Sequence, residues 1–268
     1  MLGAIIGDII GSRFEFNNTH KIDFELFTPE CSYTDDTICT IAIADAICKG
    51  IDYRDSLLHW CRKYSNPMGG YGGSFAQWIH SSNPQPYNSF GNGSAMRVSP
   101  IGWAFDDIKD VLTEAKKTAK ITHDHPEGIK GAQVVAELIF KLRNGGGKDY
   151  PVSSESVNGY TLIDGLYYEI PTMDEIRSTY HYNETCQGTV PQALRCFLDA
   201  NSFEETIRLA ISIGGDSDTI GAIAGSIAEA YYPIPSDIRD KVFDKLPTDM
   251  LKVIGSFYEM LNNKNIDV

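Results

Sequence analysis

Residues 33–47, with the sequence YTDDTICTIAIADAI, decide the fold that this chain predicts. Two carboxylates and neighbouring hydroxyls come first. Residues 38–47 then follow, apolar on almost every side of a helix, with Asp45 as their only charge. A helix that is apolar all round belongs in the interior of a protein. We therefore expect a central buried helix that carries acidic residues at its N-terminal end.

A second acidic cluster occurs far along the chain, at residues 214–221 (GGDSDTIG), again in front of an apolar helical run. The candidate oxygen ligands in the two clusters are Thr34, Asp35, Asp36, Asp216, Asp218 and Thr219. Carboxylates this crowded repel one another unless a cation lies between them. Oxygen ligands without nearby Cys or His suit a hard ion such as Mg²⁺, Mn²⁺ or Ca²⁺. Asp and Thr are also ordinary N-caps, but a cap needs one such residue and each cluster offers three, which favours metal.

The sequence DSDT at residues 216–219 also resembles the nucleophile motif of haloacid-dehalogenase-type phosphatases. That motif must follow a buried β-strand, because the strand aims the nucleophilic aspartate. Residues 207–213 have helical spacing instead, and no alternation of strands and helices surrounds them. The sequence therefore disfavours a phosphatase of this type.

Helical periodicity dominates the rest of the chain, and Gly or Pro ends each periodic segment. Further helices are expected at residues 134–142, 203–211, 220–227 and 238–246. Loops are expected at residues 66–74, 82–100 and 145–175, the last as an excursion on the surface. Strand-like alternation is nearly absent, although residues 161–170 could form a short hairpin. The pattern predicts one all-α domain over residues 1–268.

The net charge of −13 argues against nucleic acid or an anionic membrane as a partner. It does not exclude an anionic small molecule, because bound divalent ions can reverse the local sign. The six cysteines show no CxxC spacing, and Cys39 and Cys48 lie in apolar helical sequence, so we expect reduced thiols in a cytoplasmic protein. Residues 1–8 lack a basic region and include Asp8, which fits neither a signal peptide nor a membrane span.

Gly3, Gly7 and Gly11 stand four residues apart and form one stripe along an N-terminal helix. Glycine costs about 1 kcal/mol per helical position relative to alanine, so the stripe predicts close packing against another backbone. Glu15 follows, between two phenylalanines. That setting could desolvate the carboxylate and raise its pKa toward the range of a general acid, although a surface glutamate beside buried phenylalanines is the commoner arrangement.

Two glycine-rich stretches, 69–73 (GGYGG) and 91–93 (GNG), offer bare backbone N–H groups to phosphate oxygens. Neither matches the P-loop or the dinucleotide-binding fingerprint, and on their own both are ordinary turns. His123 and His125 precede an expected helix. Histidines two residues apart without a third clear ligand make a poor zinc site. Substrate contact by His123 or helix capping is favoured instead.

These motifs together resemble the ADP-ribosylglycohydrolase family over nearly the whole chain. The matching motifs are Gly7-Asp8 with Glu15, 34–37 (TDDT), 91–97 (GNGSAMR), 122–123 (TH) and 215–219 (GDSDT). The resemblance implies a compact, single-domain orthogonal helical bundle with two Mg²⁺ or Mn²⁺ ions in a central cleft. It implies a glycosidase that cleaves the bond between ADP-ribose and an acceptor, and so reverses ADP-ribosylation. The acceptor would be arginine or another protein, nucleic-acid or small-molecule group.

The resemblance also implies roles for single residues. Thr34, Asp35 and Asp36 would hold one ion, Asp216 and Thr219 the other, with Asp218 between both. The expected catalytic residues are Glu15, Asp35 and Asp218, and the assignment of acid and base among them stays open. The expected substrate-binding residues are Gly70, Gly72, Gly73, Ser89, Phe90, Gly91, Asn92, Gly93, Met96 and His123.

One departure from the family pattern concerns the acceptor. Some arginine-directed members carry an acidic residue in the glycine loop, and residues 66–75 contain none. Residues 145–185 fit the pattern least well and could shape the acceptor side of the cleft. We expect a monomer whose partner is an ADP-ribosylated substrate, with no membrane and with nucleic acid only as a modified acceptor.

A rival interpretation is a catalytically silent ADP-ribose-binding or structural protein on the same fold. Loss of one of the core aspartates would be its signature. All of them are present, namely Asp35, Asp36, Asp216 and Asp218. The sequence therefore favours an enzyme.

Overall fold

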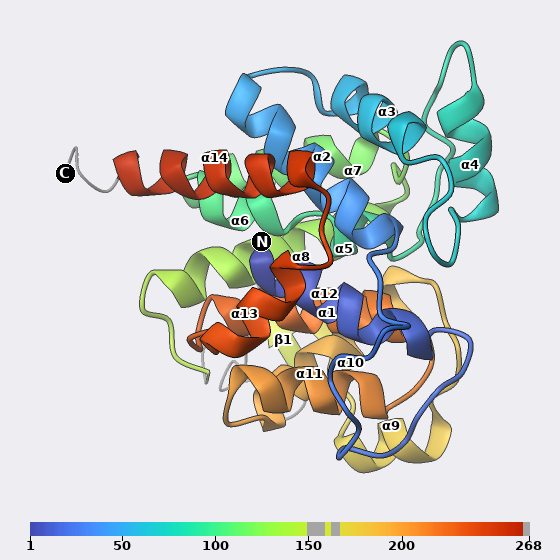
Figure 1. The fold of residues 1–268 in the computed structure, drawn as a ribbon, viewed down its shortest axis with the longest axis vertical. Helices are drawn as coiled ribbons and strands as arrows, with labels where there is room; N and C mark the ends of the chain where they lie inside the picture. The colour runs from blue at the N-terminus through green and yellow to red at the C-terminus, as the bar shows by residue number, and fades with distance from the viewer. Residues whose placement is uncertain (149–158, 162–166, 265–268) are drawn as a thin grey trace.

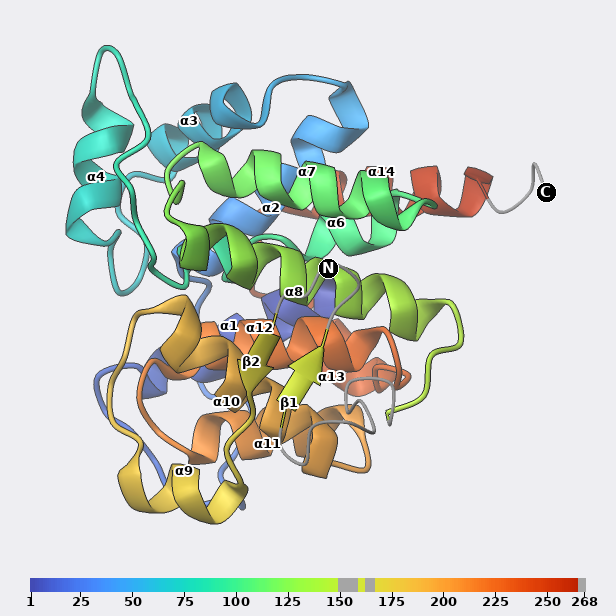
Figure 2. The same ribbon diagram turned by 180° about the vertical axis from the view of Figure 1, so that it is seen from behind.

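The computed structural model describes residues 1–148, 159–161 and 167–264, and the regular elements in this part of the chain are almost all helices (Figures 1 and 2). The elements are α1 (Leu2–Gly11), the 3₁₀ helix η1 (Ser12–Phe14), α2 (Asp35–Lys49), α3 (Tyr53–Lys63), α4 (Gly73–His80), α5 (Gly93–Met96), α6 (Ser99–Ala104), α7 (Ile108–Lys120), α8 (Pro126–Arg143), β1 (Gly159–Thr161), β2 (Tyr167–Glu169), α9 (Met173–Thr179), α10 (Cys186–Asp199), α11 (Phe203–Ser212), α12 (Ser217–Glu229), α13 (Ser236–Phe243) and α14 (Thr248–Lys264). The prediction of an all-α fold is confirmed. The antiparallel pair β1 and β2 lies where a short hairpin was expected at 161–170, but β1 begins earlier, at Gly159.

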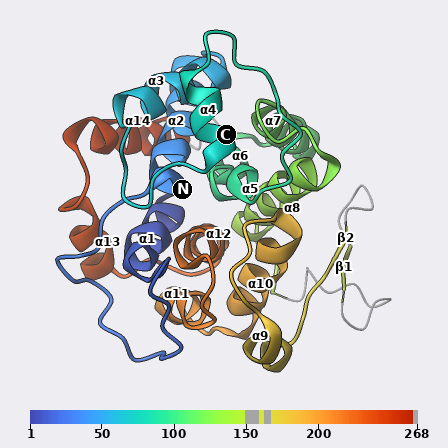
Figure 3. The same ribbon diagram turned by 90° about the vertical axis from the view of Figure 1, so that its right-hand side faces the viewer.

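Helices α1 and α12 lie side by side at the centre of the molecule (Figures 1 and 3). Gly7 of α1 faces Gly221 of α12, and a Cβ atom on Gly7 would overlap the Gly221 carbonyl group. Gly3 meets Gly225 in the same way. The predicted close approach of the glycine stripe to another backbone is confirmed. We call this contact the glycine seam.

The glycine seam places the end of α1 against the start of α12. A Cβ atom on Gly11 would lie 2.6 Å from the Cα atom of Asp218. The chain turns through η1 directly after Gly11 and reaches Glu15. Glu15 and Asp218 are therefore neighbours because two backbones touch, not because long side chains reach toward each other.

Helix α2 is buried as its sequence predicts, with Ile38 and Ile41 fully excluded from solvent. Its first turn is held by Asp8, which interrupts the apolar run of α1. The Asp8 carboxylate accepts hydrogen bonds from the backbone N–H groups of Thr34 (3.0 Å) and Thr37 (3.1 Å). A carboxylate at a helix N-terminus satisfies free N–H groups and opposes the positive end of the helix dipole. Asp8 thereby fixes the acidic start of α2 beside α1.

The structure differs from the sequence prediction in some loops and ends. Residues 82–100 were expected to form a loop, yet they contain α5 and the start of α6. Proline is tolerated in a first helical turn, where the missing N–H would have no partner anyway, and Pro100 occupies that turn of α6. Helix α13 ends at Phe243, before the expected 246. Within the expected excursion at 145–175, residues 149–158 and 162–166 lie outside the described part of the chain.

The six cysteines form no disulfide with one another. In the described part of the chain, no helix combines the length and the apolar character that a membrane span requires.

Candidate active site

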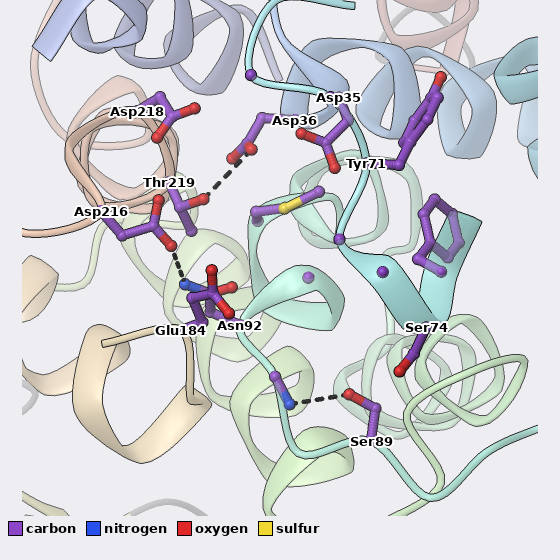
Figure 4. A pocket seen from close by; sticks show the side chains of 18 of the residues that line it. Asp35, Asp36, Tyr71, Ser74, Ser89, Asn92, Glu184, Asp216, Asp218 and Thr219 are labelled. Carbon is purple, nitrogen blue, oxygen red and sulfur yellow. Dashed lines mark hydrogen bonds between the residues drawn. The ribbon is translucent and has the colours of Figure 1, made fainter. Parts of the chain in front are cut away.

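The N-terminal ends of α2 and α12 and the residues after α1 open into one pocket of about 310 Å³ (Figure 4). The predicted residues that line it are Glu15, Asp35, Asp36, Gly70, Gly72, Gly73, Ser89, Gly91, Asn92, Gly93, Met96, His123, Asp216, Asp218 and Thr219. Thr34 and Phe90 do not line it. Segments that lie far apart in sequence are thus brought to one place.

The two acidic clusters meet across this pocket. The Thr219 hydroxyl donates a hydrogen bond of 3.2 Å to Asp36 Oδ2, which joins α12 to α2. The Asn92 amide donates a bond of 2.7 Å to Asp216 Oδ2 (Figure 4). Oxygen atoms of Glu15, Asp216 and Asp218 lie within 4.8 Å of one another. Several carboxylates therefore share one small volume.

Some of these buried carboxylate oxygens have no hydrogen-bond partner. Asp36 and Asp218 are each 2% exposed, and the Oδ1 atom of each is unpartnered. Asp216 occupies the N-cap position of α12 but makes no side-chain capping bond there. Buried, unpaired carboxylates are costly. Helix capping does not account for this arrangement, whereas a bound cation would compensate it, and an acidic cluster of hard oxygen ligands can hold a metal ion.

The crowding of the carboxylates also raises their pKa values. Burial raises the pKa of Asp218 well above its ordinary range, and the charges of Asp216 and Asp36 raise it further. Burial, followed by the charge of Asp216, raises the pKa of Glu15 to about 7. The rise expected for Glu15 is present, but Phe16 is 74% exposed. Neighbouring carboxylates contribute to the raised pKa of Glu15, whereas the sequence suggested only burial beside the phenylalanines as its cause.

Bare backbone faces the pocket at the first glycine loop. A Cβ atom on Gly70, Gly72 or Gly73 would meet no atom within 4 Å. Packing inside the protein therefore does not require glycine at these positions, although the left-handed backbone of Gly70 (φ 83°) favours it there. The loop borders the open space of the pocket. Gly69 differs, because a Cβ atom there would lie 2.5 Å from Oε2 of Glu15. Glycine at that position lets the carboxylate approach the loop.

The orientation of His123 is fixed from behind the pocket. Buried Arg97 donates through Nη2 to the Thr122 hydroxyl oxygen (2.8 Å), and that oxygen lies 2.7 Å from Nδ1 of His123. Because Arg97 can only donate, the Thr122 hydroxyl is free to donate to Nδ1. With Nδ1 as the acceptor, the ring hydrogen would lie on Nε2, which faces Gly91 and Gly93. Burial and the charge of Arg97 lower the pKa of His123 well below its usual value, so the ring is neutral.

The remaining predicted residues have other neighbours. The Thr34 hydroxyl donates to Asp8 (2.8 Å) and accepts from the Asp36 backbone N–H (3.2 Å), as the N-cap of α2. Phe90 is 44% exposed, and its ring packs beside His125, with the ring centroids 5.2 Å apart. His125 accepts a hydrogen bond from the Glu127 backbone N–H and caps α8. His125 therefore takes the capping role, and His123 lines the pocket.

The element that precedes Asp216 excludes a haloacid-dehalogenase-type phosphatase. That element is helix α11 rather than a buried strand, as the spacing of residues 207–213 predicted. Several lining residues were not singled out from the sequence. Arg97, Tyr182 and Glu184 are among them. Arg97 stands inside the predicted 91–97 motif, whereas the other two carry no sequence signal.

Comparisons with known proteins agree with this geometry. The family model described as ADP-ribosylglycohydrolase matches residues 1–265. The chain is similar to ADP-ribosylhydrolase ARH3 of Homo sapiens, with 26% identity over 87% of this chain and 84% of that protein. It is also similar to ADP-ribosylarginine hydrolase Tri1 of Pseudomonas putida, with 25% identity over 87% of this chain and 70% of that protein.

A solved structure described as an ADP-ribosylglycohydrolase-related protein complex shares the fold, with a TM-score of 0.69 and 23% identity. The match covers 97% of each chain. The motifs, the all-α architecture and the match of the family model along the chain lead to one assignment. This protein belongs to the ADP-ribosylglycohydrolase family of glycosidases.

Proposed function

We propose that this protein is a divalent-metal-dependent hydrolase that cleaves the glycosidic bond between ADP-ribose and an acceptor. The observation that carries the proposal is the division of one pocket into two unlike sides. Asp36, Asp216 and Asp218 gather on one side, and Ser74 and Ser89 lie on the other (Figure 4). One side suits a cation and the ribose next to the scissile bond. The other suits a diphosphate and a nucleoside.

The acidic side fits one or two Mg²⁺ or Mn²⁺ ions. The residues that would hold them are Asp35, Asp36, Asp216, Asp218 and Thr219. The unpartnered Oδ1 atoms of Asp36 and Asp218 support this assignment, because they are buried hard ligands without a compensating group. When bound, such ions supply positive charge that orients hydroxyl groups and activates water. Thr34 would support the metal site indirectly, because its hydroxyl accepts a hydrogen bond from the backbone N–H of Asp36.

Glu15 is the residue that we assign to proton transfer. Its carboxylate lies beside Asp216 and Asp218 but belongs to neither acidic helix start. Glycosidic cleavage develops oxocarbenium character on the sugar, and nearby carboxylates stabilise that charge. A group is also needed that takes a proton from water or gives one to the leaving group. Glu15 lines the pocket beside the acidic cluster and could carry out this proton transfer.

The other side of the pocket would bind the diphosphate. Arg97 is the only lysine or arginine among the lining residues that the structure describes. The open backbone of Gly70, Gly72 and Gly73 and the Nε2–H group of His123 provide uncharged donors. Phosphate oxygens accept from such donors and are attracted to a buried guanidinium. Binding there would place the distal ribose toward the carboxylates.

The test is release of ADP-ribose from conjugates of arginine, of serine and of an oligonucleotide. Each is incubated with Mg²⁺, with Mn²⁺ and with a chelator. We expect release from at least one conjugate with metal and loss of release with the chelator. ADP-ribose binding without release from any conjugate would instead establish the silent binding protein. Equal release with the chelator would contradict the metal requirement.

A further inference from the structure

A side-chain amide outside the pocket joins the segment that carries Glu15 to the turn that precedes Asp216. Asn18 Nδ2 donates hydrogen bonds to the carbonyl oxygens of Phe14 (2.6 Å) and Gly215 (2.8 Å). In return, the Gly215 backbone N–H donates a bond of 2.9 Å to Asn18 Oδ1. The amide therefore binds both backbone groups of one residue in the turn and, at the same time, the backbone beside Glu15.

These bonds use the hydrogen-bonding capacity of the Asn18 amide almost completely. Its nitrogen has two hydrogens, and its two shortest contacts are carbonyl oxygens, whereas its oxygen faces an N–H group. The reverse orientation of the amide would place oxygen against both carbonyls, so the network identifies the nitrogen. The Glu15 carbonyl oxygen and the Ser217 hydroxyl oxygen lie 3.3 Å from Nδ2 and complete its surroundings.

The reciprocal pair with Gly215 is not a local turn. Bonds from Asn18 to the carbonyls of Phe14 and Glu15 are of the kind that asparagine makes in any irregular segment. Gly215, however, is 197 positions away in sequence. Asn18 is exposed and does not line the pocket, so it touches neither the substrate space nor the acidic oxygens there. Any effect on the reaction must pass through the backbone that it holds.

The turn that Asn18 holds has a backbone that few residues adopt. Gly214 and Gly215 have φ values of 78° and 75°, in the left-handed region that favours glycine. Two successive glycines have more conformational freedom to lose than other residues. His20 adds a second contact, because its Nδ1 atom lies 3.2 Å from the Ser212 carbonyl oxygen. Contacts from the segment after Glu15 thus determine where this adaptable turn leads.

The turn leads directly into the acidic start of α12. Asp216 makes no side-chain capping bond, and its φ and ψ of −77° and 74° lie outside the helical region. Its carboxylate accepts a hydrogen bond from Asn92 (Figure 4), while Asn18 holds the residue before it. A shift of Gly215 would therefore move Asp216 relative to Glu15.

We propose that Asn18 is a positioning residue, which fixes the proton-transfer group Glu15 relative to the metal-binding side chain of Asp216. The inference rests on the proposed function. The glycine seam joins α1 to α12 themselves, whereas Asn18 joins the irregular chain after η1 to the irregular chain before α12. Small displacements matter at such a place, because a misplacement of about 1 Å can cost about 100-fold in rate.

The first measurement needs neither metal nor substrate. Amide hydrogen exchange of the full chain reports on the Gly215 N–H, which donates to Asn18. Asn18→Leu keeps nearly the shape of the side chain, adds no charge and removes the bonds. We expect it to speed this exchange about twofold to tenfold, the range that one hydrogen bond usually contributes. Asn17→Leu is the matched control, because Asn17 is the exposed neighbour in the same segment. Equal exchange in wild type and Asn18→Leu would overturn the inference.

The second measurement is the affinity for Mn²⁺, titrated by calorimetry into each protein well below its melting temperature. We expect Asn18→Leu to weaken binding about 10–100-fold, as for other groups that orient a metal ligand, and Asn17→Leu to bind as wild type does. At saturating Mn²⁺, kcat for a cleaved ADP-ribose conjugate should fall about 10–100-fold in Asn18→Leu. KM should stay within a few-fold, because the donors of the first glycine loop and of His123 are unchanged.

The outcomes separate the two proposals. If wild type binds no Mn²⁺ and releases ADP-ribose from no conjugate, the proposed function fails, and the exchange of Gly215 still decides whether Asn18 holds the turn. If wild type binds Mn²⁺ and cleaves a conjugate while Asn18→Leu matches it in affinity and kcat, the positioning role alone is wrong. A lower melting temperature without a change in either quantity would make Asn18 a stabilising residue only, and would also overturn the inference.

Discussion

Asp216 and Asp218 are two residues apart in sequence but have different surroundings. Asp216 accepts a hydrogen bond from Asn92, whereas Oδ1 of Asp218 is buried without a partner between α1, α2 and α12. A buried carboxylate oxygen without a hydrogen-bond partner gains most from a bound cation. The hydrogen-bond partners thus distinguish Asp216 from Asp218, although the sequence alone does not show which aspartate matters more for a bound metal ion.

Asp218→Ala should therefore cost more activity than Thr219→Ala. We expect a loss of metal affinity of at least about 10–100-fold for Asp218→Ala, because removal of even an outer-shell partner of a metal ligand typically costs that much, and a fall in turnover with it. Thr219 donates to Asp36, so its loss leaves the carboxylates in place. Metal titration by calorimetry and ADP-ribose release measure both effects. Wild-type metal affinity and turnover in Asp218→Ala would show that this residue does not bridge the ions.

Glu15→Gln should lower turnover by about 10²–10⁴-fold, the usual contribution of general acid–base catalysis. The change keeps the size of the side chain and removes its ability to exchange a proton. ADP-ribose affinity should stay within a few-fold and the metal should remain bound, because the aspartates of α2 and α12 are intact. Unchanged turnover would instead indicate that Glu15 is only a surface glutamate beside phenylalanines, without a catalytic role. Loss of metal together with turnover would make it a ligand first.

Thr122→Val should raise KM for the substrate with little change in kcat. The substitution keeps the shape of the side chain but removes the hydroxyl between Arg97 and His123. His123 then loses the contact that sets which nitrogen carries the hydrogen. An unpaired buried donor costs about 1–3 kcal/mol, so Thr122→Val should also unfold at lower temperature. Thr122→Ser keeps the hydroxyl and should restore both properties, and a wild-type KM in Thr122→Val would exclude the positioning role.

At the scale of elements, the distance between α1 and α12 governs the site. Helix α1 leads into Glu15, and α12 begins with Ser217 and Asp218. The facing glycines let the two backbones touch, and side chains at those positions would separate them. Separation would pull Glu15 away from Asp218.

Gly7→Ala should therefore reduce both stability and activity. We expect a destabilisation of about 1–3 kcal/mol or more, as for other overpacked cores, and a loss of turnover although the pocket lining is unchanged. Gly255→Ala is the control, because a Cβ atom there meets nothing within 4 Å in α14. It should be neutral or slightly stabilising, since alanine is the better helix former. A Gly7→Ala variant with wild-type melting temperature would contradict the glycine seam.

The elements also show what the sequence could and could not predict. The starts of α2 and α12 were predictable because Asp, Thr and apolar spacing act locally. The turn of α5 was missed because residues 93–96 are too short for any periodicity. The bond from Asp8 to the start of α2 was missed because it joins residues 26 positions apart. Glu184 and Tyr182 were missed because an irregular segment carries no pattern, and only the fold brings them to Glu15.

At the scale of the whole molecule, the buried apolar side chains form one connected cluster that runs from Met1 to Phe257. We expect residues 1–268 to unfold as a single domain in one cooperative transition. Mg²⁺ should raise its midpoint, because a ligand that binds only the folded state adds about 2.7 kcal/mol at 100 times its Kd. Calorimetric scans with Mg²⁺ and with a chelator measure both effects. Two separate transitions would refute the single domain, and equal midpoints would argue against the metal.

The glycine seam has a consequence for how this family diversifies. Substitutions that keep the seam preserve the hydrolytic centre, because backbone contact sets its geometry. Phe16, Tyr182 and Glu184 line the pocket on irregular chain that follows η1 or precedes α10, outside the two helices that form the seam. We therefore expect that residues on the irregular chain at the pocket mouth can be exchanged, by evolution or by design, without loss of the contact between α1 and α12 that places Glu15 beside Asp218.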